Sequence, residues 1–135
     1  MSWSESLIKL ATYEVETLQK RLAEVRDRKT GAELKLALLE AEGQAEMSRA
    51  DDDPMSGIYK TTFLEALRTR KADARAAIAE LEIEEQGARD ALAEAFEAQK
   101  KYEHVAEQAR LMERKAEAKR ETTALDELGL RKVAR

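Results

Sequence analysis

The sequence lacks cysteine altogether and has only one proline, Pro54, five glycines and few aromatic residues. Without cysteine there is no disulfide, no thiolate metal ligand and no cysteine nucleophile. So little proline and glycine cannot supply the many tight turns of a β-sandwich or β-barrel. No apolar run approaches the roughly 18 residues that span a bilayer, and residues 1–5 lack the basic and apolar regions of a secretion signal. We therefore expect a single cytoplasmic domain without β structure.

Charged residues are abundant instead, at 39% of the chain, with a formal net charge of −4. The hydrophobic fraction is 43%, and much of it is alanine. This composition is typical of long helices that pack along a thin apolar seam. The excess of acids argues against a general nucleic-acid-binding protein.

Apolar residues recur at alternating spacings of three and four through the first part of the chain. This seam consists of Ile8, Ala11, Val15, Leu18, Leu22, Val25, Lys29, Ala32, Leu36, Leu39 and Gly43. A seam of this period keeps facing one partner only when two helices supercoil, so it predicts a two-stranded coiled coil. Lys29 is the one charged member, and we expect Glu80 or Glu82 to neutralise it.

One cluster of turn residues interrupts the pattern and includes Asp51, Asp52, Asp53 and Pro54. The apolar stripe then resumes at Phe63. We predict an all-α fold in which two long helices form an antiparallel coiled-coil hairpin, the second helix being longer than the first. The expected bounds are residues 3–49 for helix one, 50–57 for the tip loop and 57–122 for helix two. The tail, residues 123–135, is expected to order only on binding.

Folding the chain at residue 53 or 54 leaves helix two beyond about Val105 without a partner from helix one. Its seam residues Ala106, Ala109 and Met112 are therefore expected to meet solvent, another copy of the chain or another protein.

No set of residues in the sequence has the pattern of a catalytic site. His104 is the only histidine, and a solvated surface residue is its simplest interpretation. The glycines are isolated, so no glycine-rich phosphate loop is present. We predict a protein that is not an enzyme and uses no metal or cofactor.

The acidic tip, Asp51 to Asp53, allows an alternative function. Carboxylates at the end of a coiled coil resemble the factors that enter the secondary channel of RNA polymerase and help to hold a magnesium ion. Those factors carry a second folded domain, for which the sequence after Gly57 leaves no room, and the acids equally suit the start of a helix. A second alternative is a structural coiled coil that self-associates by burying Ala106, Ala109 and Met112.

The last third of the chain carries the most specific pattern. Between Tyr102 and Leu128, arginines at helical spacing are followed by acids and a Leu-Asp-Glu sequence. This stretch, together with the opening run from Leu7 to Glu16, resembles the FliJ family of flagellar export proteins. The resemblance implies a two-helix hairpin that acts in the type III export apparatus and is similar to the central stalk of rotary ATPases.

The resemblance also implies partners, namely the hexameric export ATPase, the cytoplasmic domain of the membrane export gate, and export chaperones. It implies a location in the cytoplasm, at the cytoplasmic face of the inner membrane near the flagellar base. By similarity to the family pattern, the partner-binding residues are Arg110, Arg114, Arg120, Asp126 and Glu127. Phe63 and Leu67 lie where the family often presents apolar side chains beside the hairpin, so the resemblance implies a contact with the export gate. Both also fall on the seam, where a role in the core is the alternative.

Overall fold

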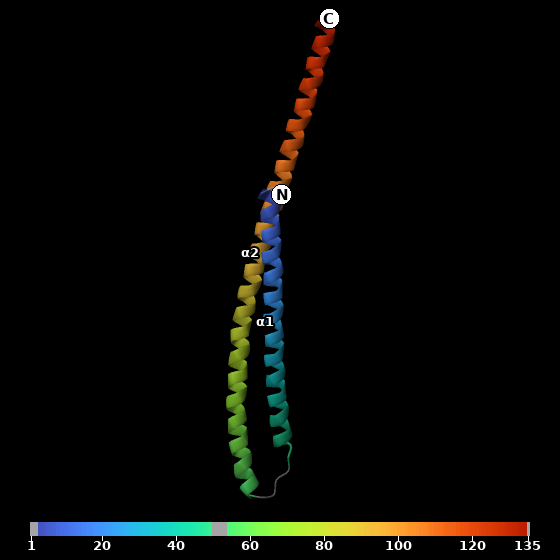
Figure 1. The fold of residues 1–135 in the computed structure, drawn as a ribbon. Helices are drawn as coiled ribbons and strands as arrows, with labels where there is room; N and C mark the ends of the chain where they lie inside the picture. The colour runs from blue at the N-terminus through green and yellow to red at the C-terminus, as the bar shows by residue number, and fades with distance from the viewer. Residues whose placement is uncertain (1–2, 50–53, 135) are drawn as a thin grey trace. The chain divides into compact units, whose positions relative to one another are not determined.

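The chain folds into two α-helices and, over the described residues, no strand. The computed structural model describes residues 3–49 and 54–134, which form α1 (Trp3–Met47) and α2 (Pro54–Ala134) (Figure 1). The predicted all-α hairpin with a longer second helix is confirmed. The acidic tip, Asp51 to Asp53, lies outside the described residues.

Tertiary contacts divide the chain into two compact units. The first, which we call the hairpin unit, is Thr17–Leu92 and contains the tip-proximal parts of both helices. The second, the terminal unit, combines Met1–Glu16 with Ala93–Arg135. In each unit a segment of α1 packs against a segment of α2 that runs in the opposite direction.

The seam predicted for α1 is the face that the structure buries. Every one of its eleven members is buried or half-buried, and Val25 is the most enclosed, at 2% exposure. Within the hairpin unit, α2 contributes buried residues one heptad apart at Leu67, Ala74, Leu81 and Ala88. The regular spacing follows from the slight supercoil, which returns each seventh residue to the partner helix. Alanine at alternate layers lets the helices approach closely.

The helices pair about one turn further along α2 than the sequence led us to expect. Lys29 Nζ lies 3.5 Å from Glu85 Oε2, so its counter-charge is Glu85 and the expectation of Glu80 or Glu82 was wrong. In the terminal unit, Gln99 Nε2 likewise donates a hydrogen bond to Thr12 Oγ1 at 3.1 Å. Near the tip, Gly57, Ile58 and Tyr59 are exposed, and Lys60 contacts the end of α1.

Two residues near the tip suit the helix ends there: Lys60 caps the end of α1, and Pro54 begins α2. Lys60 Nζ lies within hydrogen-bonding distance of the main-chain oxygens of Met47, at 3.5 Å, and Arg49, at 3.4 Å. Carbonyl groups at the end of a helix have no partner within it, so a lysine there satisfies them and complements the helix dipole. At the other end, α2 begins at Pro54 and not near residue 57, because proline suits the first helical position, where no N–H bond is required.

The C-terminal end of α2 also differs from the expected bound. The helix continues to Ala134, twelve residues beyond the end expected near residue 122. Strong helix formers fill this stretch, and Gly129 alone is not enough to stop it. Arg131 and Lys132 lie in the last turn, where positive charge complements the negative end of the helix dipole.

Candidate interaction surfaces

The C-terminal part of α2, after the buried residue Ala106, is not covered by any other part of the described chain. Ala106 is only 3% exposed, whereas every residue of the segment 107–133, which we call the end segment, is exposed. Ala109 and Met112 meet solvent as expected, but Ala106 is buried within the terminal unit. The one-turn shift in register brings Ala106 under cover and removes it as a site for self-association.

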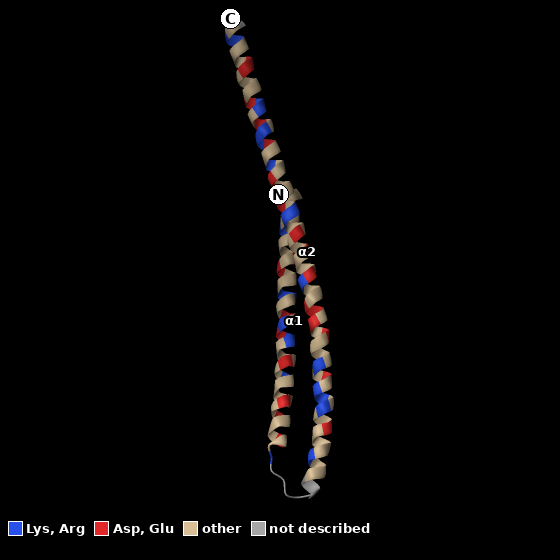
Figure 2. Cartoon of the chain, turned by 180° about the vertical axis from the view of Figure 1, so that it is seen from behind, with Lys and Arg blue, Asp and Glu red and all other residues tan. Residues whose placement is uncertain are grey.

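Large apolar side chains lie open on the end segment. They are Leu111, Met112, Leu125, Leu128, Leu130 and Val133, and all except Leu111 are more than half exposed. Acidic and basic residues are interspersed with them along this part of the helix (Figure 2). Helices in proteins derive most of their stability from packing an apolar face against another element. An exposed apolar surface of this kind is therefore suited to contact with a partner.

The structure places all five predicted partner-binding residues on α2 in the terminal unit, exposed to solvent. Arg110 forms an ion pair with Glu107 at 3.7 Å, and Arg120 Nε donates to the carbonyl oxygen of Ala116 at 3.4 Å. These are contacts within one helix, and in the part of the chain that the structure describes no ion pair joins two of the five predicted residues.

The five residues do not gather into one cluster. Arg110 and Arg114 are one turn apart on one face, since helix positions advance by about 100° per residue. Arg120 and Glu127, seven residues apart, share a neighbouring face, and Asp126 lies on the far side from Arg110. A partner that uses all five residues must therefore enclose the helix on several sides.

Phe63 and Leu67 lie in the hairpin unit. Leu67 is 2% exposed and forms a small core with Leu39 and Ala74, against which Phe63 packs as a partly buried residue. A Cβ atom added at Gly43 would come within 2.9 Å of Leu67 Cδ2. Glycine at this position of α1 is thus what allows the two helices to approach closely around Leu67.

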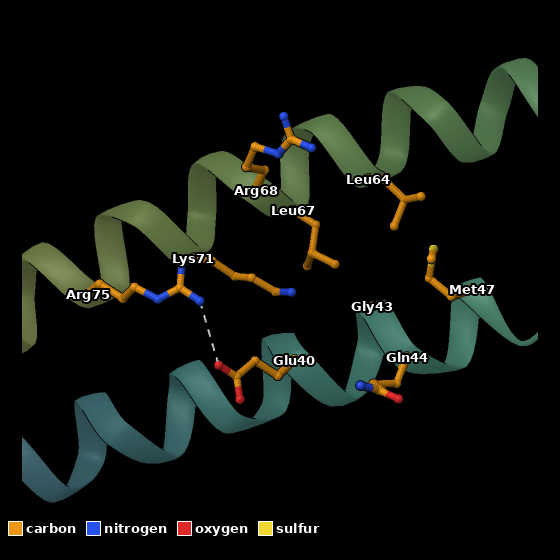
Figure 3. A pocket seen from close by; sticks show the side chains of 9 residues that line it. All are labelled: Glu40, Gly43, Gln44, Met47, Leu64, Leu67, Arg68, Lys71 and Arg75. Atoms are coloured by element: carbon orange, nitrogen blue, oxygen red, sulfur yellow. Dashed lines mark ion pairs between the residues drawn. The ribbon is translucent and has the colours of Figure 1, made fainter.

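A groove of about 660 Å³ lies beside this core (Figure 3). Leu64, Leu67 and Met47 give it an apolar wall. Its charged rim consists of Arg68, Lys71 and Arg75 from α2 and Glu40 from α1. The only ion pair among the groove residues in Figure 3 joins Arg75 to Glu40, at 3.8 Å, so the rim keeps a positive excess.

Sequence reasoning overlooked these three cations, although their spacing marks one face of a helix. Positions 68, 71 and 75 follow each other at three and four residues, which is the spacing of helical neighbours. Two acids of α1 that lie close to Gly43 and Met47 in the sequence, Glu42 and Glu46, are not among the residues that line the groove. Glu42 lines a smaller depression of about 430 Å³, and Glu46 pairs with Arg49 at 3.8 Å.

No feature of a metal centre is found over residues 3–49 and 54–134. These residues contain no group of three or more His, Asp or Glu side chains placed to hold a metal ion. His104 is exposed, as expected. Over the same residues, no helix has both the length and the apolar character needed to cross a bilayer.

Comparison with known proteins identifies the family. The family model of the flagellar FliJ protein matches residues 5–135. The chain belongs to the FliJ family. Two curated relatives, each described as a flagellar FliJ protein, come from Caulobacter vibrioides strains NA1000/CB15N and ATCC 19089/CIP 103742/CB 15. Each is 48% identical over 132 residues, which cover 98% of this chain and 95% of the relative.

No solved structure matches this FliJ-family chain. Membership in the family makes it a component of flagellar protein export and confirms the resemblance seen in the sequence. FliJ is a flagellar family and not a known family of enzymes. The family also favours a role in the flagellum over the RNA polymerase alternative.

Proposed function

We propose that this FliJ-family chain is a non-enzymatic stalk of the flagellar type III export apparatus, which binds the export ATPase hexamer and the cytoplasmic domain of the export gate and escorts export chaperones. It works in the cytoplasm, at the cytoplasmic face of the inner membrane near the flagellar base. The observation that carries the proposal is the exposure of the whole end segment, which has leucines open to solvent on a helix that α1 does not cover.

The end segment is the proposed contact with the ATPase. Its leucines offer apolar area, and burying an exposed leucine in a partner contributes roughly 1.5–3 kcal/mol before the entropy of binding is counted. Arg110, Arg114 and Arg120 offer forked donors to carboxylates, and charge-assisted hydrogen bonds of this kind orient a partner. Asp126 and Glu127 extend the proposed contact with negatively charged side chains. The distribution of these residues around the helix suits a partner that surrounds it, as a ring does.

The groove of the hairpin unit is the proposed contact with the gate. Leu67 is the buried part of the groove's apolar wall, and Phe63 packs against the core to which Leu67 belongs. Met47, at 66% exposure, and Leu64 are the apolar side chains within reach of a partner. The cations at the rim favour a gate segment with apolar side chains next to acids.

Two matched variants test both contacts in one experiment. The first changes Arg110, Arg114 and Arg120 to Glu, and the second changes Arg68, Lys71 and Arg75 to Glu, so each reverses three positive charges on α2. Each chain is used as bait in a lysate of flagellated cells, and circular dichroism verifies that both remain helical. Captured proteins are identified by mass spectrometry.

We expect wild type to recover the export ATPase and the gate. The first variant should lose the ATPase and keep the gate, and the second should do the reverse. Equal recovery of the ATPase by wild type and by the first variant would contradict the proposed site. Recovery of RNA polymerase instead of the export proteins would contradict the stalk function itself.

A further inference from the structure

The end segment carries a second apolar stripe that is distinct from the seam of the hairpin. It consists of Leu111, Arg114, Ala118, Glu121, Leu125 and Leu128, again at alternating spacings of three and four, and we call it the leucine stripe. All six residues are exposed. Leu111, five residues after the last buried residue Ala106, lies roughly 140° around the helix from it, so the stripe begins on a different face from the one that Ala106 packs against α1.

The leucine stripe is nearly symmetric about its centre, except that the charged residues on the two sides of the centre have opposite signs. A leucine stands near each end, a small alanine lies at the centre, and Arg114 and Glu121 lie on opposite sides of it. When two copies lie antiparallel about a two-fold axis beside Ala118, Leu111 of each copy meets Leu125 and Leu128 of the other. In the same arrangement Arg114 of each copy faces Glu121 of the other.

The charges also select the direction of pairing. Side by side in parallel and in register, two copies would place Arg114 against Arg114 and Glu121 against Glu121, and like charges at the contact are unfavourable. Antiparallel pairing turns both repulsions into two equivalent ion pairs. In the region that the structure covers, neither Arg114 nor Glu121 has an ion-pair partner within its own chain, so both are available.

We infer that the leucine stripe is a self-association surface through which two copies of the chain form an antiparallel, two-fold symmetric dimer. The surface is self-complementary, as a two-fold contact requires. Only a few apolar side chains per copy take part, so the dimer forms reversibly and depends on protein concentration. Dimerisation would cover Arg114 and thus compete with the ATPase contact; this last consequence rests on the proposed function, whereas the dimer itself does not.

A charge-exchange experiment on the purified full chain tests the inference without any export protein. Arg114→Glu and Glu121→Arg are each studied alone and as an equimolar mixture by sedimentation equilibrium at low salt. Lys119→Glu and Glu113→Arg serve as controls, because they make the same charge changes at positions that point away from the stripe. All four residues are exposed, so the helices should form in every variant.

We expect the average mass of wild type to rise with concentration from one chain, 15.2 kDa, towards two. Each single stripe variant should need an at least about tenfold higher concentration to dimerise, because two attractive pairs become two repulsive ones. The mixture should recover association, since the glutamate introduced in one variant faces the arginine introduced in the other. Both controls should behave as wild type.

Three results would overturn the inference. One is a wild-type chain that stays monomeric over the whole concentration range. Another is association that the stripe variants leave unchanged, which would place the contact on another surface. The third is a mixture of the two variants that associates no better than either variant alone.

Discussion

The hairpin unit and the end segment are built from the same kinds of residue and differ in what the apolar ones meet. In the hairpin unit, Leu67, Ala74, Leu81 and Ala88 recur at heptad spacing and are all buried against α1. In the end segment, Leu111, Ala118 and Leu125 recur at the same spacing and are all exposed. Heptad spacing thus marks a face that can pack, and the presence of a partner helix decides whether it does.

Charge separates the two regions as well. In the hairpin unit, basic residues of α1 face acids of α2: Glu84 binds Arg28 at 3.0 Å and Arg21 at 3.5 Å, and Lys29 binds Glu85. Closer to the tip the signs exchange, with Glu40 of α1 facing Arg75 of α2. These pairs favour one antiparallel register, whereas in the end segment the ion pair of Arg110 with Glu107 lies within a single helix.

The largest difference should appear when one leucine is shortened in each region. Leu67→Ala should lower the free energy of unfolding by about 2–5 kcal/mol, because it leaves a cavity in the core beside Leu39. Leu125→Ala, on the exposed helix, should change it by less than about 0.5 kcal/mol. Urea denaturation followed by circular dichroism measures both. Equal losses would show that the end segment is packed in the free chain.

A smaller effect is expected at the partly buried ion pair of Lys29 and Glu85. Lys29→Met should destabilise the hairpin unit by about 1–3 kcal/mol, since Glu85 is only 6% exposed and would keep Arg89, at 2.7 Å, as its remaining partner. The double variant Lys29→Met with Glu85→Met should recover at least part of that loss. If the free energy of unfolding of the double variant falls by the sum of the losses in the two single variants, the two residues are not coupled.

Two glycines of α1 form a matched pair for the next test. Gly31→Ala should raise stability by about 0.5–1 kcal/mol, because a Cβ there meets nothing within 4 Å and alanine favours the helix. Gly43→Ala should be less stable than Gly31→Ala by about 1 kcal/mol, since its Cβ would press on the buried Leu67. Thermal unfolding of both variants provides the comparison, and equal stabilisation would contradict the close approach at Gly43.

The smallest effect should come from the exposed pair at the groove. Arg75→Ala removes an ion pair whose side chains are 61% and 51% exposed, and should change stability by less than about 0.5 kcal/mol. The same change should weaken capture of the gate, because it removes one of the cations at the rim. A loss of stability as large as that of Lys29→Met would show that the groove charges hold the fold together.

Much of the fold followed from the sequence. The seam of α1 could be predicted residue by residue because heptad periodicity depends only on local spacing. The register could not, because it depends on which residues of the two helices meet, and the pairs Lys29–Glu85 and Thr12–Gln99 join residues far apart in the sequence. Glu85 was missed for a related reason: a search for apolar residues passes over a buried charge whose partner lies on the other helix.

The candidate surfaces were predictable to a different degree. Arg110 to Glu127 were found through a family pattern, which does not depend on packing. The groove at Arg68, Lys71 and Arg75 arises only when Gly43 lets the helices meet around Leu67, so it becomes visible once α1 and α2 are paired. The end of α2 could not be read from Gly129 and the charges near it, because the strong helix formers between them carry the helix on to Ala134.

Hydrogen exchange of the full chain, followed by mass spectrometry with and without the export ATPase hexamer, tests the central claim most directly. At low protein concentration we expect the hairpin unit to exchange slowly and residues 107–133 to exchange quickly, because no partner protects that part of α2. Adding the ATPase should slow exchange specifically in the end segment. Strong protection of the end segment in the free chain, or ATPase protection confined to the hairpin unit, would contradict its role as the partner-binding surface.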